Sequence, residues 1–288
     1  MFDFKILRRL ANYSRRFPSL RFLAVGYTSL RCILRGGGVV VLSERALFNS
    51  VFEDLGITPK KDLSAYSREL LENTDLQVCW EKAISIYNIK KYTCWQDRID
   101  KLSGNIVLYY AMVRELKPQI IVETGTATGS MTSWLLAALE KNGQGNLISI
   151  DIPPKKGILT MDITVEESEI GYYIPESLRH RWDYRIGDAK ILLPRILAEK
   201  QIDMFVHDSL HTRSHMLFEY AVARCLMRDK TIILSDDILW NQCFDSFAQL
   251  FGTRAYAPLS NPNIGCLVNR FDAFELSVGT NIIRTLTV

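Results

Sequence analysis

The sequence lacks the spacings and runs that mark several classes of protein. Its six cysteines, among 288 residues, are scattered and form no CxxC pair. This argues against a disulfide framework or a zinc site and favours reduced thiols in the cytoplasm. No apolar run approaches the roughly 20 residues of a membrane-spanning helix. A secretory signal is not expected either, because the sequence has no clear apolar run in front of a small-residue cleavage site.

Three ligand-binding motifs are also missing. The chain has no G-x-G-x-x-G dinucleotide turn, no P-loop with Lys followed by Ser or Thr, and no H-E-x-x-H metalloprotease motif. His207, His211 and His215 are spaced four residues apart, as on a zinc-binding helix face, but His207 falls in an expected strand, so zinc is not expected. Hydrophobic residues make up 48% and charged residues 23% of the chain, which is typical of a globular protein.

Acidic residues are nearly absent from the first 35 positions. Residues 1–35 hold eight lysines and arginines against a single acid, a net charge of +7. Because the whole chain carries +3, residues 36–288 carry −4. A basic segment interleaved with apolar residues can lie on an anionic membrane surface or serve as a transit peptide. We favour a helical appendage that packs on the core or on a second subunit, and we therefore expect a homo-oligomer. The alternative is that residues 1–35 make a peripheral contact with a membrane.

What is present is a regular alternation of strand and helix patterns. Residues 43–100 are expected to be mostly helical, after a glycine-rich break at 35–42. From there the expected helices are 104–116, 130–143, 175–182, 189–200, 213–227 and 241–252, and the expected strands are 119–125, 146–151, 184–188, 202–208, 230–237, 254–258 and 264–271. This predicts an α/β fold with a Rossmann-like, seven-stranded, mostly parallel sheet covered by helices on both faces. We divide the chain into a basic, mainly helical extension (1–103) and a domain (104–288).

Ligands of such sheets bind beyond the carboxyl ends of the strands, and a glycine-rich turn follows the first strand there. In "VETGTATGS", Gly125 and Gly129 lie four residues apart and lead into a helix. Glycines let a ligand approach the backbone, and Glu123 in front of them would repel a pyrophosphate and suit a cationic ligand. The alternative is a tight turn that binds nothing.

Acids follow the next two strands. Asp151 lies twenty-two residues beyond Gly129, where an acid typically accepts hydrogen bonds from a ribose. Asp188 in "GDA" could bind an adenine amino group. Either acid could instead be an ordinary helix N-cap.

Taken together, these motifs resemble those of the class I S-adenosylmethionine-dependent methyltransferases. "VETGTATG" is similar to their first motif, "ISID" to the second and "RIGDA" to the adenine motif, over roughly residues 104–271. The resemblance implies S-adenosylmethionine as cofactor. It implies cofactor-binding roles for Glu123, Gly125, Thr126, Gly129, Ser130, Asp151, Asp188 and Ala189.

Carboxylates also end the fourth and fifth strands, at Asp208 and at Asp236–Asp237. Clustered anions repel one another unless a cation lies among them, and oxygen ligands suit Mg²⁺ or Mn²⁺. The pattern resembles metal-dependent O-methyltransferases of the macrolide-sugar and catechol types. That resemblance implies a metal site at Asp208, Asp236 and Asp237 and a catalytic base at His211, with Asp208 beside it. The sugar type would have Glu at position 236.

We therefore expect methyl transfer to a hydroxyl of a small molecule, a sugar of a glycosylated natural product or a glycan. Alternatives are a catechol or phenol acceptor, a metal-free enzyme, or a non-catalytic cofactor-binding protein. A nucleic-acid partner is not expected, since residues 36–288 carry −4 and no "DPPY"-type loop is present. The segment 153–175 is a predicted lid. Tyr92, Trp95 and Tyr109–Tyr110 either line the acceptor pocket or pack in the core, and His207 is expected to be structural.

Overall fold

The computed structural model describes residues 38–86, 95–152, 159–160, 163–164, 170–251 and 253–270. The basic segment 1–35, Tyr92 and most of the predicted lid lie outside the described residues. Within the part of the chain that is described, no helix combines the length and the apolarity that crossing a bilayer requires.

Eight strands form one sheet in the order β1-β9-β10-β8-β7-β2-β3-β6. Only β10 runs antiparallel to its neighbours. The strands are β1 (Gly38–Leu42), β2 (Ile120–Thr124), β3 (Asn146–Asp151), β6 (Trp182–Ile186), β7 (Met204–His207), β8 (Thr231–Ser235), β9 (Arg254–Pro258) and β10 (Gly265–Asn269). A separate hairpin joins β4 (Leu159–Thr160) and β5 (Ile163–Thr164).

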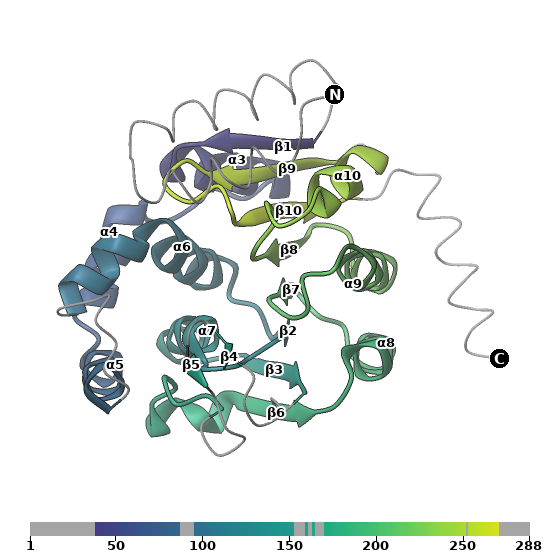
Figure 1. The fold of residues 1–288 in the computed structure, drawn as a ribbon. Coiled ribbons are helices and arrows are strands. Elements are labelled where there is room, and N and C mark those ends of the chain that lie inside the picture. Colours follow the sequence, from purple (N-terminus) through teal and green to yellow (C-terminus); the bar gives the residue numbers. More distant parts are fainter. Residues whose placement is uncertain are drawn as a thin grey trace.

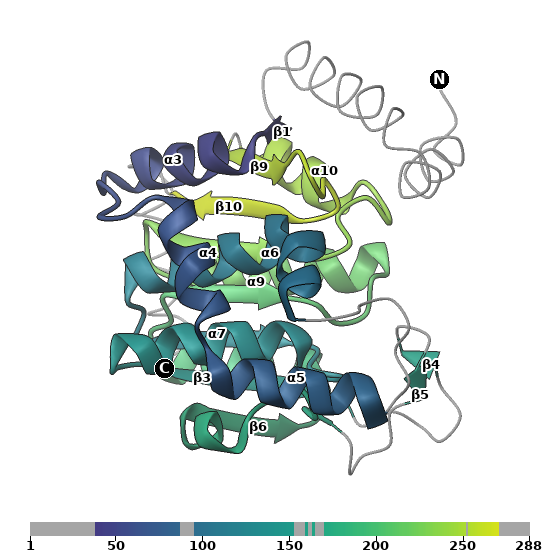
Figure 2. The ribbon, with the colours of Figure 1, turned by 90° about the vertical axis from the view of Figure 1, so that its left-hand side faces the viewer.

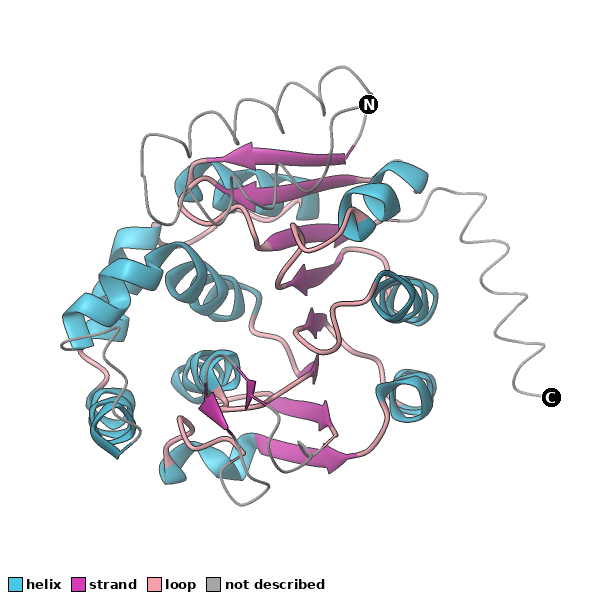
Figure 3. Ribbon diagram, viewed as in Figure 1, coloured by secondary structure: helices cyan, strands magenta, loops and turns pink. Residues whose placement is uncertain are grey.

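Helices cover both faces of the sheet (Figures 1 and 3). One face carries α3 (Glu44–Leu55), α6 (Trp95–Leu116) and α7 (Ser130–Asn142), with α4 (Leu63–Leu71) and α5 (Thr74–Ile86) outside them, as Figure 2 shows. The other face carries α8 (Ala189–Glu199), α9 (Arg213–Leu226) and α10 (Cys243–Leu250). The short 3₁₀ helix η3 (Glu176–Arg181) precedes β6.

Local sequence explains where the helices begin and end. The Asp62 carboxylate accepts a hydrogen bond from Ala65 N (2.9 Å) and caps the start of α4. Glycines in the left-handed conformation end α3 at Gly56 and α7 at Gly143. These are the signals from which the sequence predicts helix boundaries.

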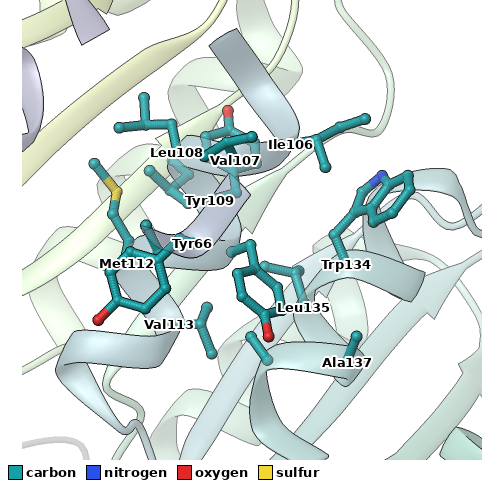
Figure 4. Packing of buried hydrophobic residues seen from close by; sticks show 14 of the residues in the cluster. Tyr66, Ile106, Val107, Leu108, Tyr109, Met112, Val113, Trp134, Leu135 and Ala137 are labelled. Carbon is teal, nitrogen blue, oxygen red and sulfur yellow. The ribbon is translucent and has the colours of Figure 1, made fainter. Parts of the chain in front are cut away.

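The core has one hydrophobic cluster on each side of the sheet. On the α6 side, consecutive residues from Ile106 to Val113 are all buried, because α6 lies between α4 and the sheet (Figure 1). Figure 4 shows part of this cluster, including Tyr109 and Trp134. Trp80, Trp134 and Trp95 stack in the same cluster, at ring-centroid distances of 5.0 and 5.4 Å.

The sheet has one more strand than the sequence predicts. Gly38–Leu42, which falls at the expected break, is β1 and pairs in parallel with β9. A run of three valines after glycines carries no alternation that would identify a strand, and its partner lies more than 200 residues away in the chain. The first strand of the sheet thus lies in the predicted extension, and the boundary placed at residues 103 and 104 falls inside α6.

The strand order also locates the site. Taking β2 as the first strand, the order β6-β3-β2-β7-β8 is the 3-2-1-4-5 order of a doubly wound sheet. Successive strands are added on one side of β2 up to β6 and on the other side from β7 onward, so the strand order reverses between β2 and β7. Ligands bind at the carboxyl ends of the strands on either side of that point. The residues after β2 and β7 are therefore the first to consider.

Candidate functional site

The loops after the parallel strands begin at one level of the sheet. Asp208 N donates to Thr124 O (2.8 Å), which joins the ends of β7 and β2. Asp236 N donates to His207 O (2.9 Å), which joins the ends of β8 and β7. Residues far apart in the sequence are therefore brought to one edge, as the sequence predicts.

The glycine turn needs its two glycines for close backbone contact. Gly125 has a φ of +84°, and a Cβ there would lie 2.1 Å from the carbonyl oxygen of Asp208. Gly129 has a φ of +77°, and its Cβ would lie 2.7 Å from the Cα of Gly171. The end of the predicted lid packs on the same turn, since Gly171 N donates to Ala127 O (2.9 Å). The turn is therefore enclosed by backbone on two sides.

Asp151, at the end of β3, stabilises this turn through hydrogen bonds. Its Oδ2 accepts hydrogen bonds from Thr126 N (2.8 Å) and Ala127 N (2.9 Å). The two amides thus bind Asp151 and are not free for a ligand. Since both bonds use Oδ2, Oδ1 is the oxygen that could accept from a ribose hydroxyl.

Glu123 is fully buried beneath the turn. Its Oε2 accepts from Thr132 Oγ1 (2.8 Å) and Ser149 Oγ (2.6 Å), while Oε1 has no hydrogen-bond partner among the described residues. Burial raises the pKa of Glu123 to about 7, although the two hydroxyls favour the carboxylate. A buried acceptor without a donor suits the ammonium group of a methionine moiety, so this residue fits the predicted cofactor.

The pKa of Glu123 gives a prediction about stability. A carboxyl whose folded pKa is about 7, against an ordinary 4.5, stabilises the fold fully below pH 4.5 and loses that contribution as pH rises through 7. Glu123→Gln resembles the protonated form. The unmodified protein should lose unfolding free energy between pH 4.5 and pH 8, and the Glu123→Gln protein should lose about 3 kcal/mol less over the same range. Urea unfolding at both pH values measures this difference.

A control for that experiment is Glu176→Gln, which changes an exposed acid on η3 and should leave the pH dependence as it is. An equal loss of stability in the Glu123→Gln and unmodified proteins would contradict the raised pKa.

The predicted adenine-side residues lie at the start of α8. The exposed Asp188 is the N-cap of this helix, and its Oδ1 accepts from Lys190 N (2.8 Å). Ala189 is buried behind it. On the methionine side, Ser130 is the first residue of α7. The structure thus shows the capping role of Asp188, and the adenine contact stays a prediction.

The structure brings the predicted base and two of the predicted metal ligands together. Nε2 of His211 lies 3.9 Å from Oδ1 of Asp208, and Nδ1 lies 3.7 Å from Oδ2 of Asp237. All three side chains are partly exposed, by 19%, 25% and 28% respectively. A ligand at the edge of the sheet could therefore reach them.

Electrostatics in this group favour a neutral base. Burial lowers the pKa of His211, and the nearby Asp237 carboxylate only partly offsets it. Burial and the charge of Asp236 raise the pKa of Asp208 well above its usual range. A neutral imidazole beside carboxylates can accept a proton near pH 7.

The negative charge of Asp208, Asp236 and Asp237 suits a bound cation, but the arrangement of their oxygens does not form a metal site. Their mutual repulsion, seen in the raised pKa of Asp208, would be relieved by a divalent ion. However, Oδ1 of Asp236 accepts from Asp237 N (2.9 Å), and Asn263 donates to Oδ1 of Asp237. No three His, Cys, Asp or Glu side chains of the described residues form a group that could hold a metal ion. The metal site stays a prediction.

Of the aromatic residues expected either to line the acceptor pocket or to pack in the core, the described ones are buried. Trp95 and Tyr110 pack in the core, and the Tyr110 hydroxyl donates to Glu69 (2.6 Å). Tyr109 differs, because its buried hydroxyl has no hydrogen-bond partner among the described residues. Burial raises the pKa of Tyr109, and the charges of Asp236 and Asp208 add to that rise.

Sequence analysis missed one residue of this region, Glu219 on α9. It is fully buried and accepts hydrogen bonds from His207 and His215 (2.5 and 2.7 Å). The available signal was an acid in a strongly apolar helix, four residues after a histidine. His207 is fully buried, in keeping with the structural role expected of it.

Comparison with known proteins agrees with these features. Residues 122–238 match the family model described as a methyltransferase domain. None of the curated proteins compared with the chain matches it.

Several solved structures resemble the fold at low sequence identity. An O-methyltransferase from Bacillus cereus in complex with SAH is 18% identical, over 68% of this chain and 91% of that one, with a TM-score of 0.46. The SAH-bound methyltransferase PaMTH1 of Podospora anserina is 14% identical, over 73% and 93%, with a TM-score of 0.48. The O-methyltransferase TomG from Streptomyces achromogenes, involved in tomaymycin synthesis and in complex with SAM, is 15% identical, over 80% and 100%, with a TM-score of 0.46.

The family match begins in β2 and ends just after β8, so it spans the glycine turn, Asp151, Asp188 and the acids around His211. These are the residues on which the resemblance to methyltransferases depends, and the sheet has the doubly wound order that the resemblance implies. Residues 122–238 thus match a methyltransferase-domain family, which agrees with the resemblance of the motifs to those of class I S-adenosylmethionine-dependent methyltransferases.

Proposed function

We propose that this methyltransferase transfers the methyl group to a hydroxyl oxygen of a small molecule, with His211 as the base. The observation that carries the proposal is the place of His211, between Asp208 and Asp237 at the carboxyl edge of the sheet. Its lowered pKa keeps the imidazole neutral and able to accept a proton near pH 7.

The residues divide into two groups with different tasks. Glu123 and Asp151 hold the cofactor through its ammonium and ribose groups, and S-adenosylmethionine, when bound, supplies a methyl group activated on a sulfonium. Transfer of that methyl group to the acceptor oxygen would break the carbon–sulfur bond and leave its electron pair on sulfur. His211 takes the proton of the hydroxyl, and Asp237 stabilises the resulting imidazolium. Positioning of the two reactants supplies most of the remaining rate enhancement.

For the acceptor, we propose a sugar hydroxyl of a glycosylated natural product or glycan. "HDSLHT" followed by "LSDD" is more similar to the sugar type of O-methyltransferase than to the catechol type, which has lysine at the base position. Trp240 is about half exposed, and its ring centroid lies 6.4 Å from that of His211. An exposed aromatic ring beside the base could cover the apolar face of a sugar.

An acceptor screen with isotope-labelled methyl donor tests this proposal. Purified protein is incubated with the donor and with glycosides, free sugars, catechols and primary amines, and labelled products are located by mass spectrometry. Label on a sugar oxygen supports the proposal, while label on a catechol would replace the acceptor class. Label on nitrogen alone, or none on any hydroxyl acceptor, contradicts it.

We further propose that Mg²⁺ or Mn²⁺ assists the reaction, held by Asp208, Asp236 and Asp237. Such an ion would lower the pKa of a hydroxyl bound to it. EDTA should then remove most activity and either metal should restore it, and Asp236→Ala and Asp237→Ala should each lose activity while cofactor affinity, measured by calorimetry, is kept. Glu176→Ala, at an exposed acid, is the control. Full turnover after EDTA would leave His211 as a base without a metal.

A further inference from the structure

We propose that Glu219 is a positioning residue for the base. Glu219 orients the ring of His207, which packs against His211, and through Ser209 it holds the turn that carries His211. This inference rests on the role proposed for His211, and it adds a residue outside the cofactor and acceptor sites to the machinery.

Glu219 joins three separate segments of the fold. Its Oε2 accepts from Thr124 Oγ1 (2.7 Å) at the end of β2 and from His207 Nδ1 (2.5 Å) at the end of β7. Its Oε1 accepts from Ser209 Oγ (3.0 Å) in the following loop and from His215 Nε2 (2.7 Å) on α9. One side chain therefore ties the two strand ends at the switch point to the turn between Asp208 and His211.

Glu219 is an anion in this setting, and this determines which atoms donate. Burial alone would raise the pKa of Glu219, but the hydrogen bonds from His207 and His215 outweigh it and lower the pKa to about 2. An ionised carboxylate only accepts hydrogen bonds. Nδ1 of His207 must therefore carry a proton, which fixes the orientation and the tautomer of this ring when it is neutral.

The fixed ring of His207 packs against the base. The two imidazole centroids are 5.3 Å apart, with an interplanar angle of 82°. Nε2 of His207 is buried and has no hydrogen-bond partner among the described residues. The contact with His211 thus depends on the orientation that the Nδ1–Glu219 bond gives to His207.

A purely structural role would not require this carboxylate. Replacing a whole buried ion pair with well-packed apolar residues of similar volume is often neutral or stabilising. Glu219 and its partner His207 are nevertheless buried together, each at 0% exposure. Such a polar group fixes geometry at some cost in stability, as expected of residues that support a reacting side chain.

The test compares Glu219→Gln with His215→Gln. Glutamine at 219 keeps the size of the side chain but cannot accept from both imidazoles. Because outer partners of this kind commonly contribute 10–100-fold, we expect kcat to fall by about that factor, with KM for the acceptor and Kd for S-adenosylmethionine changed less than about twofold. His215→Gln retains a donor on α9 and does not touch the His207 ring, so kcat should stay near that of the unmodified protein. Glu219→Asp, which keeps the charge, should recover part of the loss.

Imidazole ¹⁵N NMR separates positioning from folding. With four histidines in the chain, each signal can be assigned by single substitution. In Glu219→Gln the Nδ1–H signal of His207 should be lost and the His211 signals should shift, whereas His215→Gln should leave both in place. If Glu219→Gln does not fold, the same measurements are made on Glu219→Asp. In that variant kcat and the NMR signals of His207 and His211 should change in the same direction, by smaller amounts.

Two results would overturn the inference. One is an unchanged His207 tautomer in a folded position-219 variant, and the other is a loss of stability in that variant with normal kcat per folded molecule. Failure of the proposed function looks different. In that case His211→Ala turns over normally, or no hydroxyl acceptor is methylated, and the NMR arm still decides whether Glu219 holds His207 and His211.

Discussion

Replacing His211 by alanine should lower kcat by about 10²–10⁴, the usual contribution of a general base. Alanine removes the imidazole that takes the hydroxyl proton and leaves the side chains of Asp208 and Asp237 in place. The residues proposed to hold the cofactor, Glu123 and Asp151, lie on β2 and β3, so Kd for S-adenosylmethionine should change little. Single-turnover kinetics with the acceptor found by the screen, together with calorimetry, measure both quantities.

The pH–rate profile makes this test specific for the imidazole. In the unmodified protein kcat should fall as pH drops through the pKa of His211, which burial lowers below its ordinary 6.5. His211→Ala should lack this acidic limb. The matched control is His180→Ala, which removes an exposed imidazole on η3 that contacts Glu140 and should leave kcat intact. Normal turnover by His211→Ala would exclude it as the base.

Replacing Gly125 by alanine should strongly destabilise the fold. The new Cβ would lie 2.1 Å from Asp208 O and 2.5 Å from Asp208 C, both backbone atoms that cannot move without separating β2 from β7. The positive φ of +84° adds about 1–2 kcal/mol of strain for a non-glycine residue. Together with overpacking this gives a loss of about 2–5 kcal/mol in unfolding free energy, and the folded fraction should bind S-adenosylmethionine more weakly.

Gly143→Ala separates the collision from the strain. Gly143 ends α7 with a φ of +68°, and a Cβ there meets nothing within 4 Å. It should lose only about 1–2 kcal/mol, measured by the same urea unfolding. Equal losses at the two positions would show that contact between the strand ends is unimportant. A Gly125→Ala protein that does not fold, beside a folded Gly143→Ala protein, agrees with the prediction.

Much of the fold could be read from local patterns. The strand 254–258 and the helix beginning at Arg213 lie where periodicity predicts them, because a buried strand or an amphipathic helix leaves its repeat in the sequence. β1 could not be read in this way. Three valines after glycines suit several conformations, and pairing with β9 selects one of them.

The sequence by itself determined which residues stand at the ends of the strands. Asp151, Asp208 and His211 were found because strand ends in a parallel sheet share one edge, a rule that needs only the order of elements. Only the tertiary structure decided what these residues touch. Asp151 holds the amides of the glycine turn, and Glu219 joins residues up to 95 positions away in the chain. Periodicity reports whether a side chain is buried. It carries no information about which distant atom becomes its partner, since that depends on how strands and helices pack.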